Sequence, residues 1–144
     1  MSDSMGAEVV VAGADRRAGG SPGAVSVLVR QWRQEVEGVA EGYSWCAPEL
    51  MNDLGCRTTP AEEWPQLPAA VREAWEPELR GLDERFRAAT IPWPGRGDGD
   101  GRWWMWRIPR LIHAEPGERC DERGWPAGWD MMPFAKPDAV RVIF

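Results

Sequence analysis

Ten tryptophans stand among the 144 residues of this chain, and they constrain its fold more than any other feature of the sequence. An indole side chain is large and mostly apolar, so each one needs a core, a neighbouring ring or a partner to cover it. A chain of this length suits one ordinary domain and buries about two-thirds of its unfolded surface. We therefore expect a globular domain whose packing is organised around tryptophan.

Two long amphipathic helices are predicted within residues 21–90. The first begins at Ser21, an N-cap followed by proline, and its apolar residues recur at helical spacing through Tyr43. The second covers residues 68–89, where Pro77 predicts a kink or a restart. Each apolar stripe carries one tryptophan that packing explains, and these two are Trp32 and Trp75.

Short helices are expected between the two long ones. Residues 48–54 carry an apolar face and are followed by Gly55, which suits a helix C-terminus. Thr59 opens a capping-box pattern, and Pro65 and Pro68 limit this next helix to about one turn.

The pattern changes from helical to β after a loop. Residues 92–101 are rich in glycine and predict a flexible loop. Residues 102–144 are expected to be β-rich, because 102–108 alternates aromatic side chains like a strand and 139–144 is apolar enough to form a last strand. The predicted fold class is α+β, with the two long and several short helices plus a small antiparallel C-terminal sheet or hairpin.

The beginning of the chain has a different composition. Residues 1–20 are rich in glycine, alanine and serine and are predicted to be a disordered leader, so the single globular domain is expected to cover 21–144. The sequence shows no secretory signal and no apolar run near the ~18 residues that a membrane span needs. A cytoplasmic location away from membranes is therefore the expectation.

Three short segments between residues 43 and 109 are moderately specific as a set. They are Asn52-Asp53-Leu54 with Arg57, Leu82-Asp83 with Phe86 and Thr90, and Trp103-Trp104 with Arg107 and Pro109. In these segments the chain resembles a loosely defined group of small proteins from GC-rich actinobacteria. That group has no established activity, so the resemblance implies a fold expectation and no function.

The polar members of these segments favour a structural interpretation over a catalytic one. Asp53 and Arg57 lie four residues apart and can pair across one helical turn. Asp83 lies beside a core position, where a carboxylate needs a partner, so Arg57 and Asp83 are a candidate bridge between helices. Thr90 is predicted to cap the turn after the second long helix.

Charge favours some partners over others. The formal net charge is −6, and an acidic surface repels phosphate backbones, so nucleic acid is not an expected partner. A basic protein partner fits better, because opposite charge speeds encounter. Net charge of this size also simply maintains solubility.

The sequence carries no catalytic or metal-binding signature. A phosphate loop, a dinucleotide fingerprint and the H-E-x-x-H motif are all missing. The three cysteines and the single histidine, His113, lack the ligand spacing of a zinc site, so neither a metal nor another cofactor is predicted. A nucleophile pair of Cys120 and His113 needs an oxyanion-binding element and a third group, and no motif supplies either. An enzyme would have to assemble its site from scattered residues.

The candidate binding site is the aromatic segment that follows the glycine-rich loop, because its predicted strand carries indoles on both faces. An exposed face of tryptophan and arginine is typical of binding hot spots. A cover by the segment of Trp125 and Trp129 is the favoured arrangement, since a bare aromatic patch promotes aggregation. The candidate residues are Trp103, Trp104, Trp106, Arg107 and His113.

Two functional hypotheses follow. The first is a non-catalytic interaction or regulatory module, of the immunity-protein or antitoxin kind, that binds a basic protein partner. The alternative is a small-molecule-binding protein or small enzyme, with a tryptophan-lined pocket and Arg107 or His113 as its polar anchor. The alternative requires a concave site of ~300 Å³ or more around one of those two residues.

Overall fold

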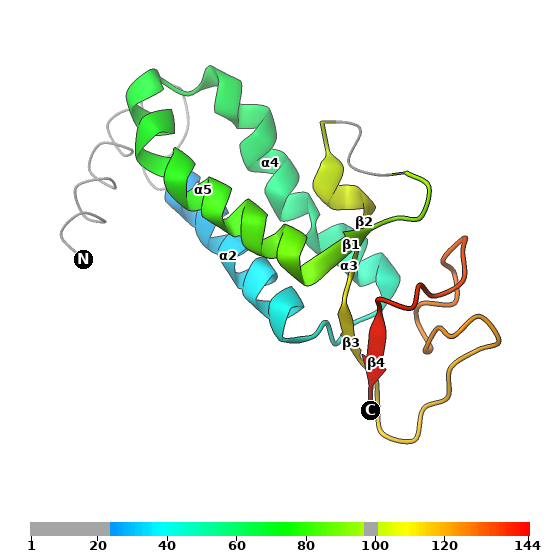
Figure 1. Ribbon diagram of the computed structural model, residues 1–144. Helices are drawn as coiled ribbons and strands as arrows, with labels where there is room; N and C mark the ends of the chain where they lie inside the picture. Colours follow the sequence, from blue (N-terminus) through cyan, green and yellow to red (C-terminus); the bar gives the residue numbers. More distant parts are fainter. Residues whose placement is uncertain (1–23, 97–100) are drawn as a thin grey trace. The chain divides into compact units, whose positions relative to one another are not determined.

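The computed structural model describes residues 24–96 and 101–144 (Figure 1). The predicted leader, residues 1–20, lies outside the described residues, as do residues 97–100 of the predicted loop. The described chain is α+β, as predicted, with helices and short strands in the order that the sequence suggests. No helix in this part of the chain is long and apolar enough to cross a membrane.

Contacts between residues divide the chain into two compact units. The described part of the first unit comprises residues 24–34 and 56–84. That of the second comprises residues 35–55, 85–96 and 101–144. The single domain expected for 21–144 stays a prediction.

Four α-helices take up the helical region. They are α2 (Ala24–Glu41), α3 (Ala47–Asp53), α4 (Gly55–Glu63) and α5 (Ala69–Ala89), and a 3-10 turn at Trp64–Gln66 precedes α5. The two long helices are confirmed, although the predicted start of the first, Ser21, lies outside the described residues. Helix α2 ends before Gly42, whose φ of 122° is open to glycine and strained for other residues.

Two predicted helix boundaries are wrong. Gly55 is predicted only to end the helix before it, but it is the first residue of α4. The two helices follow each other directly because Leu54, between them, keeps right-handed helical angles (φ −65°, ψ −15°). Helix α4 therefore begins four residues before Thr59 and carries Pro60 in its interior. Of the kink or restart predicted at Pro77, the restart is absent, since α5 runs through this residue. A proline removes only one backbone hydrogen bond from a long helix whose apolar face is buried.

The first unit buries the predicted apolar stripes of both long helices. Val29, Trp32 and Val71 have no exposed surface, and Trp75 is only 7% exposed. The stripe residues buried in this unit are Val25, Val29 and Trp32 on α2, and Val71, Trp75, Leu79 and Leu82 on α5. Packing thus accounts for both helical tryptophans, as predicted.

An ion pair in the same unit connects α4 with α5. Arg57, which is 7% exposed, donates from Nε and Nη2 to the two carboxylate oxygens of Asp83, each at 2.9 Å. The indole Nε1 of Trp32 donates to the same carboxylate at 3.0 Å. The predicted bridge between Arg57 and Asp83 is confirmed, and it also supplies the partner that a buried indole N–H needs.

The second unit contains two pairs of short strands. β1 (Thr90–Pro92) runs antiparallel to β2 (Arg107–Pro109), with Ile91 opposite Ile108. β3 (Leu111–His113) runs parallel to β4 (Arg141–Ile143), and Tyr43 makes a single bridge to Ile112 (Figure 1). An antiparallel pair is confirmed, but the last strand pairs in parallel. The segment 114–140 must therefore return to the start of β3, as any connection between parallel strands does.

The tryptophan-rich segment is not the strand that its alternation predicts. Residues Trp103–Trp106 form a 3-10 turn, closed by a hydrogen bond from the Met105 nitrogen to the Arg102 carbonyl at 3.0 Å. Strand β1 ends at Pro92, opposite Arg107, and only one hydrogen bond continues the pairing, from the Trp93 nitrogen to the Trp106 carbonyl at 2.9 Å. A backbone without a partner strand satisfies its polar groups within a local turn.

Candidate functional site

The predicted site tryptophans lie in the second unit and are covered by the chain's own side chains. Trp104 is buried, with 2% of its surface exposed, and its ring meets that of Trp103 edge to face at 5.8 Å. Trp103 also packs against Phe86, and the guanidinium of Arg87 lies 3.7 Å from the centre of its ring. The segment is therefore not a bare aromatic patch.

Trp106 has a similar environment. The guanidinium of Arg96 lies 3.6 Å from its ring centre, and Trp93 meets it edge to face at 5.2 Å. Phe134, from the segment between β3 and β4, contacts Trp93 at 5.2 Å. The C-terminal segment thus contributes to an internal cover, through Phe134. The rings continue from Phe134 to Trp125, Trp129 and Tyr43, with centroid distances of 6.2, 5.9 and 6.2 Å.

Arg107 donates hydrogen bonds to groups around the end of α5. Its Nε donates to the Thr90 hydroxyl oxygen at 2.8 Å, and its Nη2 donates to the carbonyls of Arg87 and Thr90 at 3.3 Å. The Thr90 hydroxyl in turn donates to the Phe86 carbonyl at 2.7 Å, which confirms its predicted capping role. Arg107 is only 7% exposed, so these contacts hold the guanidinium in place inside the unit.

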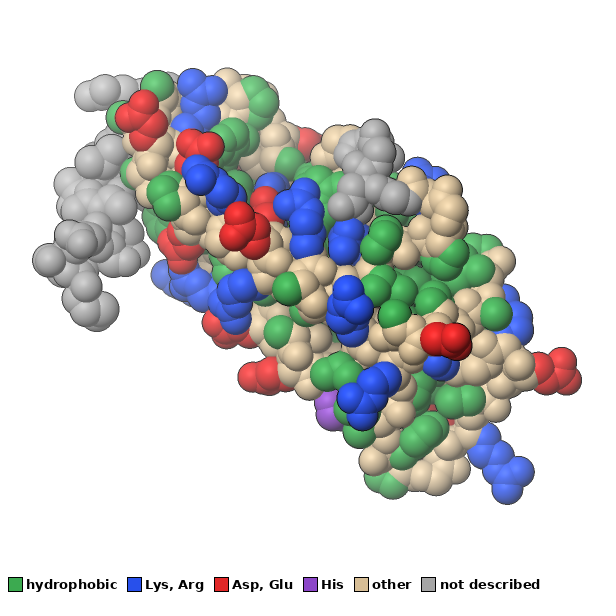
Figure 2. All heavy atoms as spheres, viewed as in Figure 1, with side chains coloured by type: hydrophobic (Ala, Val, Ile, Leu, Met, Phe, Trp, Pro, Cys, Tyr) green, Lys and Arg blue, Asp and Glu red, His purple; other side chains and the backbone are tan. Residues whose placement is uncertain are grey.

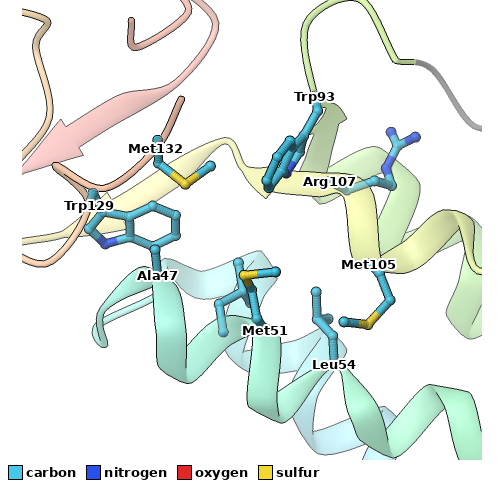
Figure 3. A pocket seen from close by; sticks show the side chains of 9 residues that line it. Ala47, Met51, Leu54, Trp93, Met105, Arg107, Trp129 and Met132 are labelled. Carbon is cyan, nitrogen blue, oxygen red and sulfur yellow. The ribbon is translucent and has the colours of Figure 1, made fainter. Parts of the chain in front are cut away.

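A crevice beside Arg107 is almost filled. Figure 3 shows methionine side chains from three separate segments converging on it, while the Arg107 guanidinium points away from them. Its volume of about 10 Å³ is room for roughly one water molecule. It is a packing gap and far below a ligand pocket. The lining residues are Ala47, Leu50, Met51, Leu54, Trp93, Met105, Arg107, Trp129 and Met132.

The larger concave site in the second unit contains His113. This cleft has a volume of about 210 Å³, and Trp45 on its wall is 68% exposed. Three segments that are distant in sequence form it: the residues before α3, the end of β3 with the turn that follows, and the loop before Trp129. Its lining residues are Ser44, Trp45, Cys46, Ile112, His113, Ala114, Glu115, Glu118, Pro126, Ala127 and Trp129.

The backbone around Trp45 is held while its indole is exposed. The Trp45 carbonyl accepts a hydrogen bond from the Trp129 indole at 3.1 Å, and the Ala47 nitrogen donates to the Gly128 carbonyl at 2.9 Å. Gly128 has a φ of 85°, and a Cβ there would lie 2.8 Å from the Cβ of Cys46. Only glycine allows this close approach, which holds the backbone next to Trp45 against the loop of Gly128.

His113 is seated in the cleft by its neighbours. Its backbone nitrogen donates to the Tyr43 carbonyl at 2.8 Å, and its ring Nε2 lies 3.1 Å from the Glu41 carbonyl. The ring occupies the space beside Gly42, because a Cβ on that residue would lie 2.0 Å from the His113 Cδ2. The histidine side chain, the only one in the chain, reaches the surface, as Figure 2 shows.

The charge of the cleft is negative at neutral pH. Among the described residues that line it, the acidic side chains are Glu115 and Glu118, and the lining includes no lysine or arginine. They stand at the two ends of a turn closed by a hydrogen bond from the Glu118 nitrogen to the Glu115 carbonyl at 3.0 Å, with Gly117 at φ 86°. The Cα atoms at the ends of such a turn lie within about 7 Å of each other, so both glutamates lie on the same rim of the cleft.

A second group of acidic side chains lies in the same unit, outside the cleft. The Tyr43 hydroxyl donates to Asp53 at 2.8 Å, and burial together with this bond raises the pKa of Tyr43. Burial, and then the charge of Asp53, raise the pKa of Glu35 to about 7. Asp53 thus binds the tyrosine hydroxyl, and Arg57 binds Asp83, while the predicted pairing of Asp53 with Arg57 stays a prediction.

The structure brings together one of the five predicted site residues, His113, with residues that the sequence did not single out. Trp103, Trp104, Trp106 and Arg107 support packing, while Trp45 is the exposed indole. Trp45 lies in the short link between two helices and off both apolar stripes, a position that does not by itself tell whether the indole is exposed. The function has to be argued from the chemistry of this cleft, because comparisons of the chain with protein-family models, with curated proteins and with solved structures find no match.

Proposed function

We propose that the protein is a non-catalytic interaction module that binds a basic protein partner at the cleft of Trp45, His113, Glu115 and Glu118. The observation that carries the proposal is an indole 68% exposed on the wall of a concave site whose rim holds two carboxylates. Tryptophan is among the residue types that dominate binding energy at interfaces. A cation over an indole gains about 0.5–2 kcal/mol, and nearby carboxylates add to that attraction.

The charge of the whole chain supports the same partner. A net charge of −6 attracts a basic protein at long range and speeds its association. Contact at the cleft then supplies the specificity, because the carboxylates disfavour an acidic competitor. Binding of this kind weakens as salt concentration rises.

A second candidate function is binding of a small molecule in the same cleft. His113 and the Cys46 thiol both line it, so it offers polar groups to a ligand. Its volume of about 210 Å³ is smaller than the ~300 Å³ expected for a pocket of that kind, which favours a single side chain as the occupant.

Binding to short peptides tests the proposal. Fluorescence anisotropy with labelled peptides of alternating basic residues and glycine should show saturable binding that salt weakens, and a peptide of alternating glutamate and glycine should not bind. Trp45→Ala, and Glu115→Gln with Glu118→Gln, should each weaken binding about tenfold or more.

Matched controls separate the cleft from general electrostatics. Glu122→Gln with Asp138→Asn removes the same charge from exposed residues outside the cleft, and Met131→Ala removes an exposed apolar side chain. These variants should bind nearly as the parent does. An equal loss in the controls, or no binding of any basic peptide, would rule the proposal out.

A further inference from the structure

We infer that the group seated in this cleft is the guanidinium of an arginine side chain of the partner protein, an inference that rests on the proposed function. Three kinds of biological cation fit an acidic, aromatic site: an ammonium, a methylated ammonium and a guanidinium. The shape of the cleft distinguishes among them.

The cleft offers one open indole face. Trp129 also lines it, but Trp125 stacks on that ring at 5.9 Å with an interplanar angle of 17°, and Tyr43 meets it edge to face at 6.2 Å. Trp129 is 1% exposed. Trp45 is therefore the aromatic wall that the described residues offer to a ligand. A methylated ammonium is recognised by a cage of several rings, whereas a planar guanidinium stacks on one face.

The carboxylates suit the same group. Glu115 and Glu118 line the cleft from the two ends of a closed turn. A guanidinium carries five N–H donors in a fixed plane, so it can stack on Trp45 and still donate sideways to two carboxylates. An ammonium has no flat face to stack, and it holds its water more strongly.

The chain already uses this pairing twice in its second unit. Arg87 lies 3.7 Å from the ring centre of Trp103, and Arg96 lies 3.6 Å from that of Trp106. Each of those partly exposed indoles is thus capped by an arginine of the same chain. Trp45 is more exposed than either, and no such guanidinium caps it among the described residues. A partner's arginine completes the same arrangement there.

Peptides that differ in one group test the inference on the full chain. Four labelled peptides alternate glycine with arginine, lysine, trimethyl-lysine or citrulline, the last being a neutral analogue with the shape of arginine. The arginine peptide should bind about tenfold more tightly than the lysine peptide, and the citrulline peptide should not bind. Arginine amide, as a free small molecule, should compete only weakly.

Each result decides something. Equal or tighter binding of the lysine or trimethyl-lysine peptide overturns the guanidinium inference and leaves the proposed function standing. Failure of every cationic peptide to bind overturns both. Competition by arginine amide as strong as that of the peptide overturns the protein partner as the source of the guanidinium.

Variants add a readout of specificity. In Glu115→Gln with Glu118→Gln, the affinity for the arginine peptide should fall close to the affinity for the lysine peptide, because the guanidinium N–H donors lose their carboxylate acceptors. Trp45→Leu, which keeps an apolar surface without a ring, should lose most of the arginine preference, whereas Trp45→Phe should keep part of it. An unchanged arginine preference in Trp45→Leu would contradict the stacking geometry. Far-UV circular dichroism should show no change of fold, since the Trp45 side chain is largely exposed.

Discussion

Removing the Asp83 carboxylate should be among the most destabilising single changes in the first unit. Asp83→Ala removes three hydrogen bonds at 2.9–3.0 Å, two from Arg57 and one from the Trp32 indole. It also leaves a guanidinium that is 7% exposed without its carboxylate. Breaking a buried ion pair in this way costs about 3–5 kcal/mol, which is a large part of the ~5–15 kcal/mol that keeps a domain folded.

Urea unfolding followed by circular dichroism measures this loss. The exposed pair of Arg80 and Glu76, 3.6 Å apart on one helix, supplies the control, since Glu76→Ala should change stability by less than about 0.5 kcal/mol. Replacing both buried charges, with Arg57→Met and Asp83→Leu, should recover much of the loss, because no uncompensated charge stays buried. A loss in Asp83→Ala no larger than in Glu76→Ala would refute the reasoning.

Three further predictions concern the second unit. The pKa of Glu35 is raised from 4.5 to about 7, so the folded state binds the extra proton and the free energy of unfolding should fall as pH rises between these values. The fall should reach on the order of 1–3 kcal/mol after allowance for partial exposure, and urea unfolding at several pH values should show it vanish in Glu35→Gln. Gly42→Ala should strain a backbone at φ 122° and displace His113, costing about 1–3 kcal/mol and shifting the NMR signals of the chain's single imidazole. Thr90→Val keeps the shape of a fully buried side chain but removes the acceptor of Arg107, so thermal unfolding should show a loss of about 1–3 kcal/mol.

The helices could be predicted from the sequence because their signal is local. Trp32 and Trp75 recur in step with apolar neighbours, and a period near 3.6 residues needs no knowledge of the rest of the fold. The bridge from Arg57 to Asp83 followed from the cost of a carboxylate at the edge of a core. The error at Gly55 has a local cause as well, since a glycine permits a left-handed helix end without requiring one.

The sheet could be predicted only in part, because strand formation depends on a partner. The alternation in Trp103–Trp106 is what a strand needs in its own sequence, but a strand also needs a neighbour. The neighbouring strand β1 is three residues long and ends opposite Arg107. Nothing in residues 102–108 encodes the length of that partner. The parallel pairing of β4 with β3 is equally hard to predict from local sequence, since 27 residues, 114–140, separate the two strands.

The candidate site could hardly be predicted at all, because its three segments meet only in the folded chain. Tryptophan alone does not mark it, since an indole in a short link looks the same in sequence whether it is buried or exposed. Trp45 differs from Trp103 and Trp106 because no arginine among the described residues lies over its ring. Arg87 and Arg96 lie over other indoles, Arg107 binds backbone carbonyls, and Arg123 donates to the carbonyls of residues 130, 132 and 134.

These arginines contact rings and backbone carbonyls of the second unit. Among the described residues, Glu115 and Glu118 accept no side-chain hydrogen bond and join no ion pair, so the rim of the cleft keeps the acceptors that the proposed function requires. A chain rich in arginine can therefore still present an acidic binding site. The arginines named above contact rings and carbonyls of the second unit, whereas the cleft is lined by two glutamates, so the negative net charge and the many arginines are compatible.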